Sequence, residues 1–226
     1  MATMRGIDVS SHQGKIDPTK LPQVEFCITK ATEGKTYVNP ECDRVVQLCR
    51  KAGLPWGFYH YARNNDAVAE ADFFVSSCWN YFGEGIPVLD WEEDQSVEWV
   101  NKFLQRVYDK TRVWCWVYAN AWRFDQGTVN RHCDRWVARY PNVLRPSIEW
   151  TLPERPKVDG LMCAWQFASD GQVRGYSGKL DVNIFYGGPD QWRAYARGNR
   201  GDADDTAPLP TITVEDENYR VDITRK

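Results

Sequence analysis

The sequence predicts an α/β protein built as a barrel of eight strands. Eight short β-like runs recur along its 226 residues, and over the first half of the chain they alternate with helical patterns. Past Tyr140 the helical patterns fade, which fits a barrel whose last strands are joined by loops or hairpins. A doubly wound sheet is the competing fold. No Gly-rich phosphate loop joins a strand to a helix, so the barrel is favoured.

The expected strands are short runs rich in apolar, β-branched and aromatic residues, as half-buried strands require. In chain order they are 4–9, 24–31, 56–61, 87–92, 112–118, 135–138, 161–168 and 180–186. Residues 141–159 are rich in proline and turn residues, and they are expected to form a loop.

Three amphipathic helices are expected between the early strands. The first begins at Asn39 as its N-cap, with proline at the first helical position, and Gly53 ends it. Residues 67–82 and 96–111 have the length and apolar spacing of the other two helices.

Composition argues against two classes of protein. A formal net charge of -3 and a pI near 5.7, without a basic stripe, argue against a nucleic-acid binder. No apolar segment is long enough to span a bilayer, so membrane insertion is not expected. The N-terminus MATMRGIDVS lacks the apolar run and cleavage site of a signal peptide, which predicts that the chain stays in the cytosol where it is made.

Metal binding and disulfides are also not expected. The seven cysteines are odd in number and never spaced C-x-x-C, and they lie in apolar runs or on one helical face, as reduced core residues do. His12 and His60 have no third ligand at metal-site spacing, so hydrogen-bonded structural roles are expected for both. The sequence therefore predicts a site without metal or cofactor.

The composition divides the chain into two parts. Residues 1–198 carry the barrel pattern, whereas 199–226 begin with a linker rich in glycine, aspartate and proline. The last residues alternate apolar and polar side chains around a turn, so they form either a short hairpin or a disordered tail. Two strands alone are marginal in water, so a hairpin would dock on the barrel, a second copy or a partner such as the wall.

Polar and aromatic side chains gather at the predicted strand ends. In barrel enzymes the chemistry lies at the C-terminal ends of the strands, where a structural core has no use for such residues. The side chains at these ends are Asp8, Lys30, Tyr61 with Arg63, Asp90 with Glu92, Tyr118, Trp136 with Tyr140, Gln166 and Asp181.

The stretch VLDWEED holds the densest group of acids. On an extended chain Asp90 and Glu92 share one face and Trp91 lies on the other. Two adjacent carboxyl groups cannot both ionise freely, so their pKa values separate, as general acid catalysis requires. The alternative is that these acids are solvated in a loop, or cap the next helix, as Glu93 and Asp94 are expected to do.

Six motifs in order resemble glycoside hydrolase family 25. They are GIDVSSHQG near the N-terminus, KATEG at 30–34, GFYHYA at 57–62, VLDWE at 88–92, WQF at 165–167 and LDVNIF at 180–185. The resemblance covers about residues 4–197. It implies an irregular TIM-like (β/α) barrel with eight strands and fewer than eight helices, and the activity of an N-acetylmuramidase of the bacteriophage endolysin type. The substrate implied is the β-1,4 bond between N-acetylmuramic acid and N-acetylglucosamine in bacterial peptidoglycan.

The resemblance also implies the catalytic residues. Glu92 is expected to be the general acid, with its pKa raised by an anionic Asp90, which in turn stabilises the positive charge that develops on the sugar. Asp8 and Asp181 are expected to support the pair, although they could instead cap a turn and pair with a buried cation. The attacking group is left open between a carboxylate, water and the substrate's acetamido oxygen, with the acetamido route favoured.

Further side chains at the strand ends are candidate substrate contacts. Tyr61, Tyr118, Trp136 and Tyr140 are either subsite faces for sugars or core residues. Gln166 would bind the acetamido group or satisfy a backbone group. The other candidates are Arg63, Lys30 and Glu33, of which Lys30 and Glu33 could simply form a salt bridge.

Two other functions remain in competition. One is a barrel that binds peptidoglycan but has lost turnover, against which the intact Asp90 and Glu92 argue. The other is a chitinase-like glycosidase, but such enzymes carry a longer D-x-x-D-x-D-x-E motif, and Ile86 to Leu89 supply no acids before Asp90. As a phage lysin, the chain would wait in the host cytoplasm until a separate protein permeabilised the membrane, and would then act on the wall.

Overall fold

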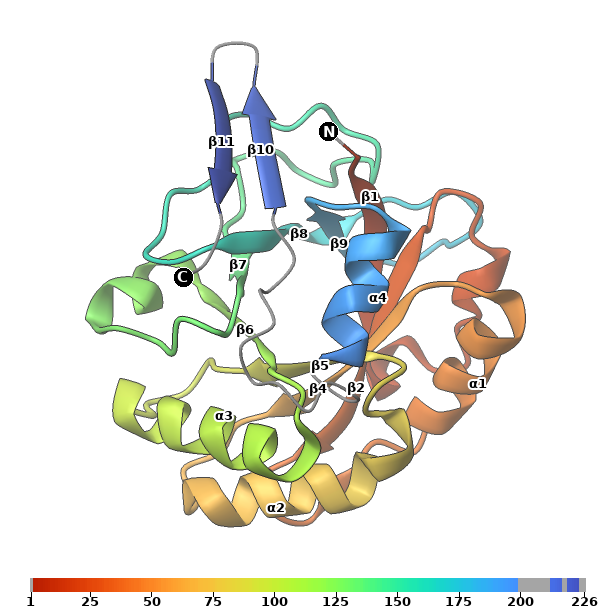
Figure 1. The fold of residues 1–226 in the computed structure, drawn as a ribbon. Coiled ribbons are helices and arrows are strands. Elements are labelled where there is room, and N and C mark those ends of the chain that lie inside the picture. The colour runs from red at the N-terminus through yellow and green to blue at the C-terminus, as the bar shows by residue number, and fades with distance from the viewer. Residues whose placement is uncertain (1, 199–211, 217–218, 224–226) are drawn as a thin grey trace.

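The computed structural model describes residues 2–198 and the backbone of 212–216 and 219–223. Eight strands close into a barrel, because β1 pairs with both β9 and β2 (Figure 1). The barrel strands are β1 (Met4–Val9), β2 (Phe26–Glu33), β4 (Trp56–Tyr61), β5 (Ile86–Asp90), β6 (Trp116–Asn120), β7 (Arg135–Ala138), β8 (Met162–Gly171) and β9 (Leu180–Phe185). A short strand, β3 (Tyr37–Val38), pairs with the end of β2 outside the ring. The predicted irregular barrel is confirmed.

Strand direction changes at one place in the ring. From β1 through β2 and β4 to β8, every neighbouring pair is parallel. β9 runs antiparallel to both β8 and β1. The start of β9 therefore lies at the edge where the parallel strands end, and Asp181 pairs with Asp8 in the register.

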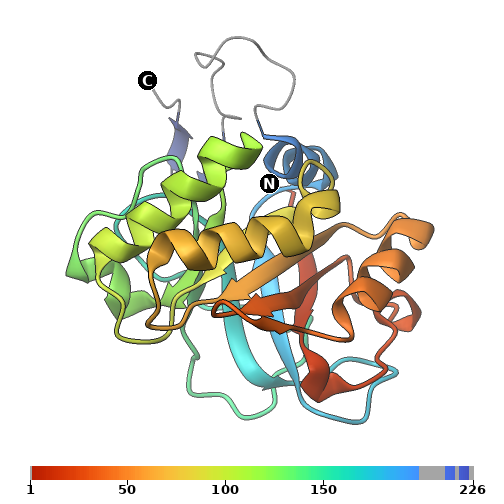
Figure 2. The same cartoon turned by 90° about the horizontal axis from the view of Figure 1, so that it is seen from below.

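Helices cover only part of the barrel, as expected. α1 (Cys42–Ala52), α2 (Ala67–Cys78) and α3 (Val97–Thr111) follow β3, β4 and β5. α2 and α3 lie side by side (Figure 2), and Arg106 of α3 donates to both carboxylate oxygens of Asp72, at 2.8 and 3.0 Å. After β6 only a short 3-10 segment, Ala121–Gln126, precedes β7, and the connection from β7 to β8 contains no helix.

One helix escapes prediction. α4 (Pro189–Arg197) closes the N-terminal end of the barrel, where Trp192 packs 4.7 Å from the ring of Phe26 and its Nε1 donates to the Trp56 carbonyl at 3.1 Å. The signals were present, because Pro189 occupies the first helical position and Gly198 follows the helix. The helix has only nine residues, and two of its few apolar residues after Pro189 are alanines, so its apolar periodicity is weak.

Five of the eight predicted strand ranges differ from the structure; the strand expected at 161–168 spans Met162–Gly171, and the strand expected at 180–186 ends at Phe185. The strand expected at 112–118 begins at Trp116, because Arg112 adopts a left-handed conformation (φ 59°) that ends α3. The strand expected at 24–31 begins at Phe26 and continues to Glu33, and the strand expected at 87–92 spans Ile86–Asp90. Glu92 therefore lies beyond the strand, in the loop that follows it.

The predicted cap of the first helix was also wrong. Asn39 is buried, and its side chain donates to the Lys30 carbonyl at 2.7 Å. This hydrogen bond connects the segment between β3 and α1 to β2. The helix begins three residues later, at Cys42 after Glu41. Gly53 ends it in the left-handed conformation, as expected.

The apolar core has two layers. The barrel interior is filled by side chains from alternate strand positions and by Trp192, whereas a larger cluster lies between the strands and α1 to α3. All seven cysteines are buried with free thiols, which confirms their assignment to the core. Burial raises the pKa of the Cys115 and Cys163 thiols well above the usual value, so these thiols stay protonated.

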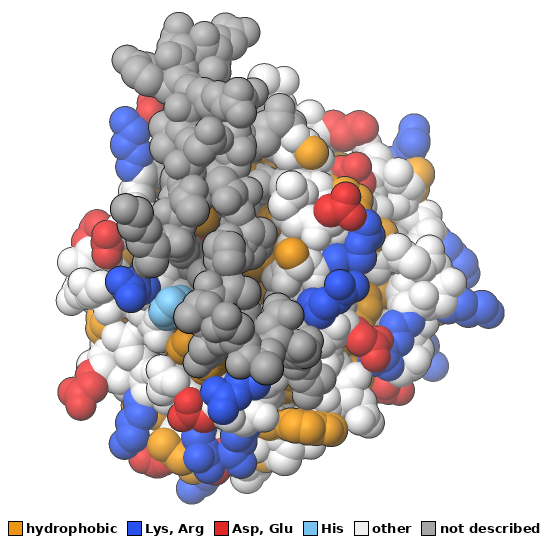
Figure 3. Space-filling view, viewed as in Figure 1, with side chains coloured by type: hydrophobic (Ala, Val, Ile, Leu, Met, Phe, Trp, Pro, Cys, Tyr) orange, Lys and Arg blue, Asp and Glu red, His pale blue; other side chains and the backbone are white. Residues whose placement is uncertain are grey.

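The molecular surface mixes both signs of charge. On the face in Figure 3, acidic and basic side chains of the described residues are interspersed. Among the described residues, no helix is both long and apolar enough to cross a membrane. In the tail, β10 (Ile212–Asp216) pairs antiparallel with β11 (Tyr219–Ile223), while the expected linker at 199–211 lies outside the described residues.

Candidate active site

A hollow of about 230 Å³ opens where the parallel strands end. It brings together all four predicted catalytic acids and four of the predicted substrate contacts. The lining side chains are Asp8, Ser10, His12, Gln13, Tyr59, Asp90, Glu92, Tyr118, Trp136, Tyr140, Gln166 and Asp181. The position at the C-terminal edge of the strands is that of barrel active sites.

Asp90 and Glu92 form the central pair. Asp90 ends β5 and is buried, with one carboxylate oxygen that has no hydrogen-bond partner among the described residues, whereas Glu92 is exposed. Trp91 points the opposite way and is fully buried, with its Nε1 donating to the Gln95 carbonyl at 3.0 Å. Burial, followed by the charge of Glu92, raises the pKa of Asp90 well above the usual value. Asp90 therefore keeps its proton to a higher pH than a free carboxyl does.

Asp8 and Asp181 lie beside this pair on adjacent strands. They are cross-strand partners in β1 and β9, so their side chains share one face of the sheet. Burial raises the pKa of Asp8 to about 6, against two side-chain hydrogen bonds that lower it. Burial and the neighbouring charges of Asp8 and Glu92 raise the pKa of Asp181 to about 8. Four carboxyl groups in one hollow thus cannot all be ionised near neutral pH.

Gln166 has an orientation fixed by two tyrosines. Tyr118 and Tyr140 both donate their hydroxyl protons to its Oε1, at 2.7 and 2.5 Å. Its Nε2 is then directed at Asp8 Oδ2, at 2.9 Å. The amide therefore positions a carboxylate that lines the hollow, in addition to any contact it makes with a substrate.

Asn183 acts in the same way and was missed from the sequence. Trp136 Nε1 donates to Asn183 Oδ1 at 2.8 Å, and Asn183 Nδ2 donates to Asp8 Oδ2 at 2.7 Å. Asn183 is fully buried, two residues after Asp181 on the same face of β9. A polar residue at an inward strand position was the available signal.

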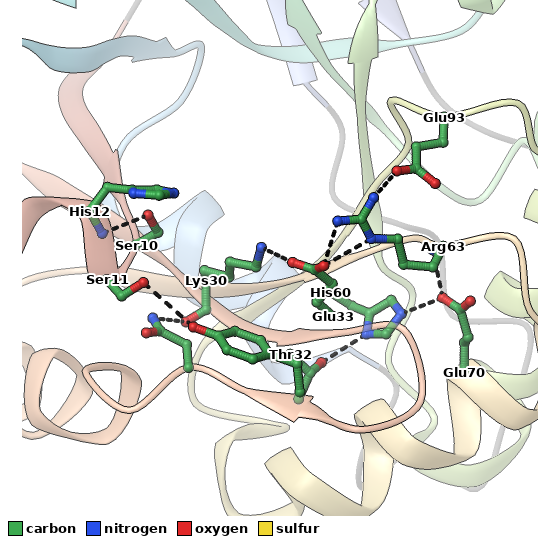
Figure 4. A network of polar contacts seen from close by, with 12 residues as sticks. Ser10, Ser11, His12, Lys30, Thr32, Glu33, His60, Arg63, Glu70 and Glu93 are labelled. Atoms are coloured by element: carbon green, nitrogen blue, oxygen red, sulfur yellow. Dashed lines mark hydrogen bonds and ion pairs between the residues drawn. The ribbon is translucent and has the colours of Figure 1, made fainter.

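The other predicted contacts form a separate network beside the hollow (Figure 4). Glu33 forms ion pairs with Lys30 and Arg63, at 2.5 and 2.6 Å, and Arg63 also pairs with Glu93. The ring of Tyr61 lies close to both cations, 4.7 Å from the Lys30 nitrogen and 4.9 Å from the Arg63 guanidinium carbon. None of the four predicted contacts lines the hollow that holds the acids.

A bulge in β2 explains this network. The register between β2 and β4 shifts between Lys30 and Thr32. In a regular strand, residues three apart face opposite sides, but the extra residue brings Lys30 and Glu33 to the same side. Glu93, expected to lead into or cap the next helix, is tied to Arg63 instead, and Ser96 caps α3 by accepting from the Trp99 amide at 3.2 Å.

The two histidines differ in role. His60 is buried between Thr32 and Glu70, with its ring nitrogens 2.8 and 2.9 Å from their side-chain oxygens, which confirms a structural role. His12 was expected to be structural too, but it is exposed and lines the hollow, because the 3-10 turn Ser11–Gln13 places it at the rim. Within the described residues, no group of three His, Cys, Asp or Glu side chains could hold a metal ion.

A second hollow of about 250 Å³ continues from the first, and the sequence did not predict it. Glu92, Tyr118 and Tyr140 line both hollows. Trp122 adds an indole that is 52% exposed. Arg123 holds this part together, because its guanidinium carbon lies 4.8 Å from the Trp122 ring and its Nη2 donates to the Glu92 carbonyl at 2.5 Å.

An irregular barrel with paired carboxyl groups at its strand ends, flanked by aromatic faces, is the arrangement of a glycoside hydrolase. The family model described as "Glycosyl hydrolases family 25" matches residues 7–176. The chain belongs to this family.

Similar proteins include lysozymes of bacteria and phages. The "Autolytic lysozyme" of Clostridium acetobutylicum is 29% identical over 80% of this chain, which spans only 56% of that protein. The "Lysozyme" of Streptococcus phage Cp-9 is 37% identical over 40% of the chain and 26% of its own length. The crystal structure of the bacterial lysozyme from Streptomyces coelicolor superimposes with a TM-score of 0.73 at 27% identity, covering 87% of this chain and 98% of that one.

Proposed function

We propose that this chain is a lysozyme of the N-acetylmuramidase type, which hydrolyses the β-1,4 bond between N-acetylmuramic acid and N-acetylglucosamine in bacterial peptidoglycan. One observation carries the proposal. The buried Asp90 and the exposed Glu92 share a hollow at the strand ends. Family membership and the similarity to lysozymes supply the substrate class.

In this proposal Glu92 delivers the proton. The carboxyl that protonates the leaving oxygen must reach the substrate, and Glu92 is the exposed member of the pair. Asp90 is buried beneath it, and the charge of Glu92 is one cause of the raised pKa of Asp90. Because the two carboxyl groups are coupled, the shared proton belongs to the pair, and loss of either group removes the acid. After proton transfer, the ionised pair stabilises the oxocarbenium-like carbon.

The attacking group in this proposal is the substrate's own acetamido oxygen. Asp8 and Asp181 would orient and polarise the acetamido group, because both face the hollow and Asp8 is held by two amides. The route forms a cyclic intermediate on one face of the sugar, which water then opens from the other. The anomeric configuration is therefore retained, and proton NMR of the first-formed product would refute this route by detecting inversion.

The exposure of each aromatic side chain in the hollow indicates whether it can contact a sugar. Tyr140 is 50% exposed and faces the hollow, so it offers a flat apolar surface to a sugar ring. Tyr118 and Trp136 are buried and hydrogen-bonded, so they shape the floor of the hollow. Tyr61 and Arg63, at its edge, would contact more distant parts of the strand, and Lys30 and Glu33 would hold them in place.

Substitution of the acid tests the proposal. Glu92→Gln keeps the size of the side chain and removes the carboxyl group that would donate the proton, so we expect peptidoglycan hydrolysis to fall by about 10²- to 10⁴-fold. Glu98→Gln is the matched control, because Glu98 is exposed in the first turn of α3 and lines neither hollow. The assay is clearing of purified cell walls, with chitin as a second substrate.

The two competing functions predict other results. A chitinase-like enzyme would digest chitin. A barrel that only binds would sediment with walls and leave them intact in every variant.

We further propose that the chain acts in phage-mediated lysis, from the host cytoplasm to the cell wall. The support is the similarity to a phage lysozyme. Expression in a bacterium should leave cells intact until the membrane is permeabilised, and lysis should then follow within minutes. Lysis without permeabilisation would refute the proposal that the chain is retained in the host cytoplasm.

A further inference from the structure

A third hollow, of about 420 Å³, lies against the outer side of β8. Its walls come from the segment after β7 and the loop before β8. Pro141, Pro153 and Pro156 supply rigid apolar surface beside the buried indole of Trp165. Because proline fixes the backbone φ angle, these walls lose little entropy when a ligand binds.

The hollow is positively charged, although the chain as a whole is acidic. Arg139, Arg155 and Lys157 line it together with a single acid, Glu154. Glu154 pairs with Lys157 at 3.3 Å. Among the described residues neither arginine forms an ion pair, and Arg155 packs 5.3 Å from the ring of Tyr186, which restricts its motion. Two uncompensated guanidinium groups therefore face the same space.

Arg139 connects this hollow to the active site. It also lines the hollow that contains Trp122 and Glu92. Its backbone amide donates to the Gln166 carbonyl at 3.2 Å, and its carbonyl accepts from Trp165 Nε1 at 2.7 Å. Two adjacent residues of β8, Trp165 and Gln166, thus fix the backbone of Arg139 between the active-site hollows and the third hollow.

We propose that the hollow formed around Arg139, Arg155 and Trp165 binds carboxylate groups of the peptide stems of peptidoglycan. The inference rests on the proposed function, because the stem is attached to the muramic acid that would lie in the adjacent cleft. Stem peptides carry several free carboxylates, and the guanidinium group binds a carboxylate through two parallel hydrogen bonds. The apolar walls accommodate the small aliphatic side chains of the same peptide.

The test uses three forms of one glycan oligomer with the purified full chain. The first carries stems with free carboxylates, the second has the same stems with these groups amidated, and the third has no stems. For Arg155→Gln, whose arginine lines the third hollow and neither of the other two, we expect KM to rise about three- to tenfold on the first substrate only, with kcat unchanged. Added salt should raise the parent's KM on the first substrate in the same direction.

The control variant is Arg174→Gln, which removes an exposed arginine that lines none of the three hollows. Equal effects of Arg155→Gln on all three substrates, or no effect on any, would overturn the inference while leaving the proposed hydrolysis intact. A parent that cleaves none of the three would instead overturn the proposed function, and the inference with it. Thermal midpoints of the variants confirm that each one folds.

Discussion

At the scale of single residues, the active site depends on how its carboxyl groups are held. Two amides, from Gln166 and Asn183, donate to one oxygen of Asp8 and oppose the effect of burial on its pKa. Each amide is itself oriented by aromatic side chains, Tyr118 and Tyr140 for one and Trp136 for the other. The aromatic residues therefore act on the chemistry indirectly, by orienting the groups that hold Asp8.

Gln166→Glu tests this arrangement. A carboxylate would still accept from both tyrosines, but it would no longer donate to Asp8. We expect the pKa of Asp8 to rise above about 6 and kcat/KM to fall about tenfold or more. The checks are a carbon-13 NMR titration of Asp8 and initial rates on soluble glycan. An unchanged Asp8 titration would show that the amide does not set its protonation.

At the scale of elements, the reversed direction of β9 builds the site. Asp181 lies near the beginning of β9, and only an antiparallel strand brings that end beside the ends of β1 and β5. The sequence predicted that Asp181 lies at the site, but it did not predict the direction of its strand. Side chains alternate with a period of two in both parallel and antiparallel strands, so the pattern does not reveal the direction. The motifs at the strand ends identified the four acids, because burying a carboxyl group in an apolar core is energetically costly.

Other elements could not be read in this way. The bulge in β2 leaves no mark on the hydrophobic pattern, so Lys30 and Glu33 were expected in the cleft and form a network beside it. Trp122 was missed because an exposed indole in a loop resembles any other loop residue. Tertiary contacts, which local patterns do not encode, decide both cases.

α4 supports the site from the opposite end of the barrel. Trp192 is 2% exposed and packs against Phe26, Trp116 and Phe185. Trp192→Ala should lower the free energy of unfolding by about 3–5 kcal/mol, measured by urea denaturation. At temperatures where the variant stays folded we expect near-parent KM, because Trp192 does not line the cleft. A loss below about 1 kcal/mol would mean that the helix does not hold the barrel closed.

At the scale of the whole molecule, the buried acids make stability depend on pH. A carboxyl whose pKa is raised on folding adds stability that is complete below its unfolded pKa and is lost as the pH rises through its folded pKa. For Asp8 and Asp181 the folded values are about 6 and about 8. The protein is therefore expected to lose stability as the pH rises from about 4 to about 8, with most of the loss above about pH 5.

Asp181→Asn tests this dependence. Asparagine does not titrate, so the loss of stability from pH 5 to pH 9 should shrink by on the order of 1–3 kcal/mol. Urea unfolding at several pH values, monitored by tryptophan fluorescence, measures the change. Carboxyl groups with lowered pKa, such as Glu70 and Asp72, are ionised throughout this window and do not disturb the comparison. An equal loss in parent and variant would place the pH dependence elsewhere.

The tail is the remaining question at this scale. β10 and β11 form an antiparallel pair, and an isolated pair of strands is marginally stable in water. We propose that this hairpin docks on a second copy of the chain or on the wall. Light scattering of the full chain, and of a chain ending at Gly198, should differ in oligomeric state or in wall binding. Identical behaviour of the two would leave the hairpin without either role.

The central claim is tested most directly by the chemistry of the cut ends. Cell walls digested by the purified chain are reduced with borohydride, and the fragments are identified by mass spectrometry. The account predicts reduced N-acetylmuramic acid at the new ends, and almost none after digestion with Glu92→Gln. New ends at N-acetylglucosamine, or equal digestion by the variant, would contradict it.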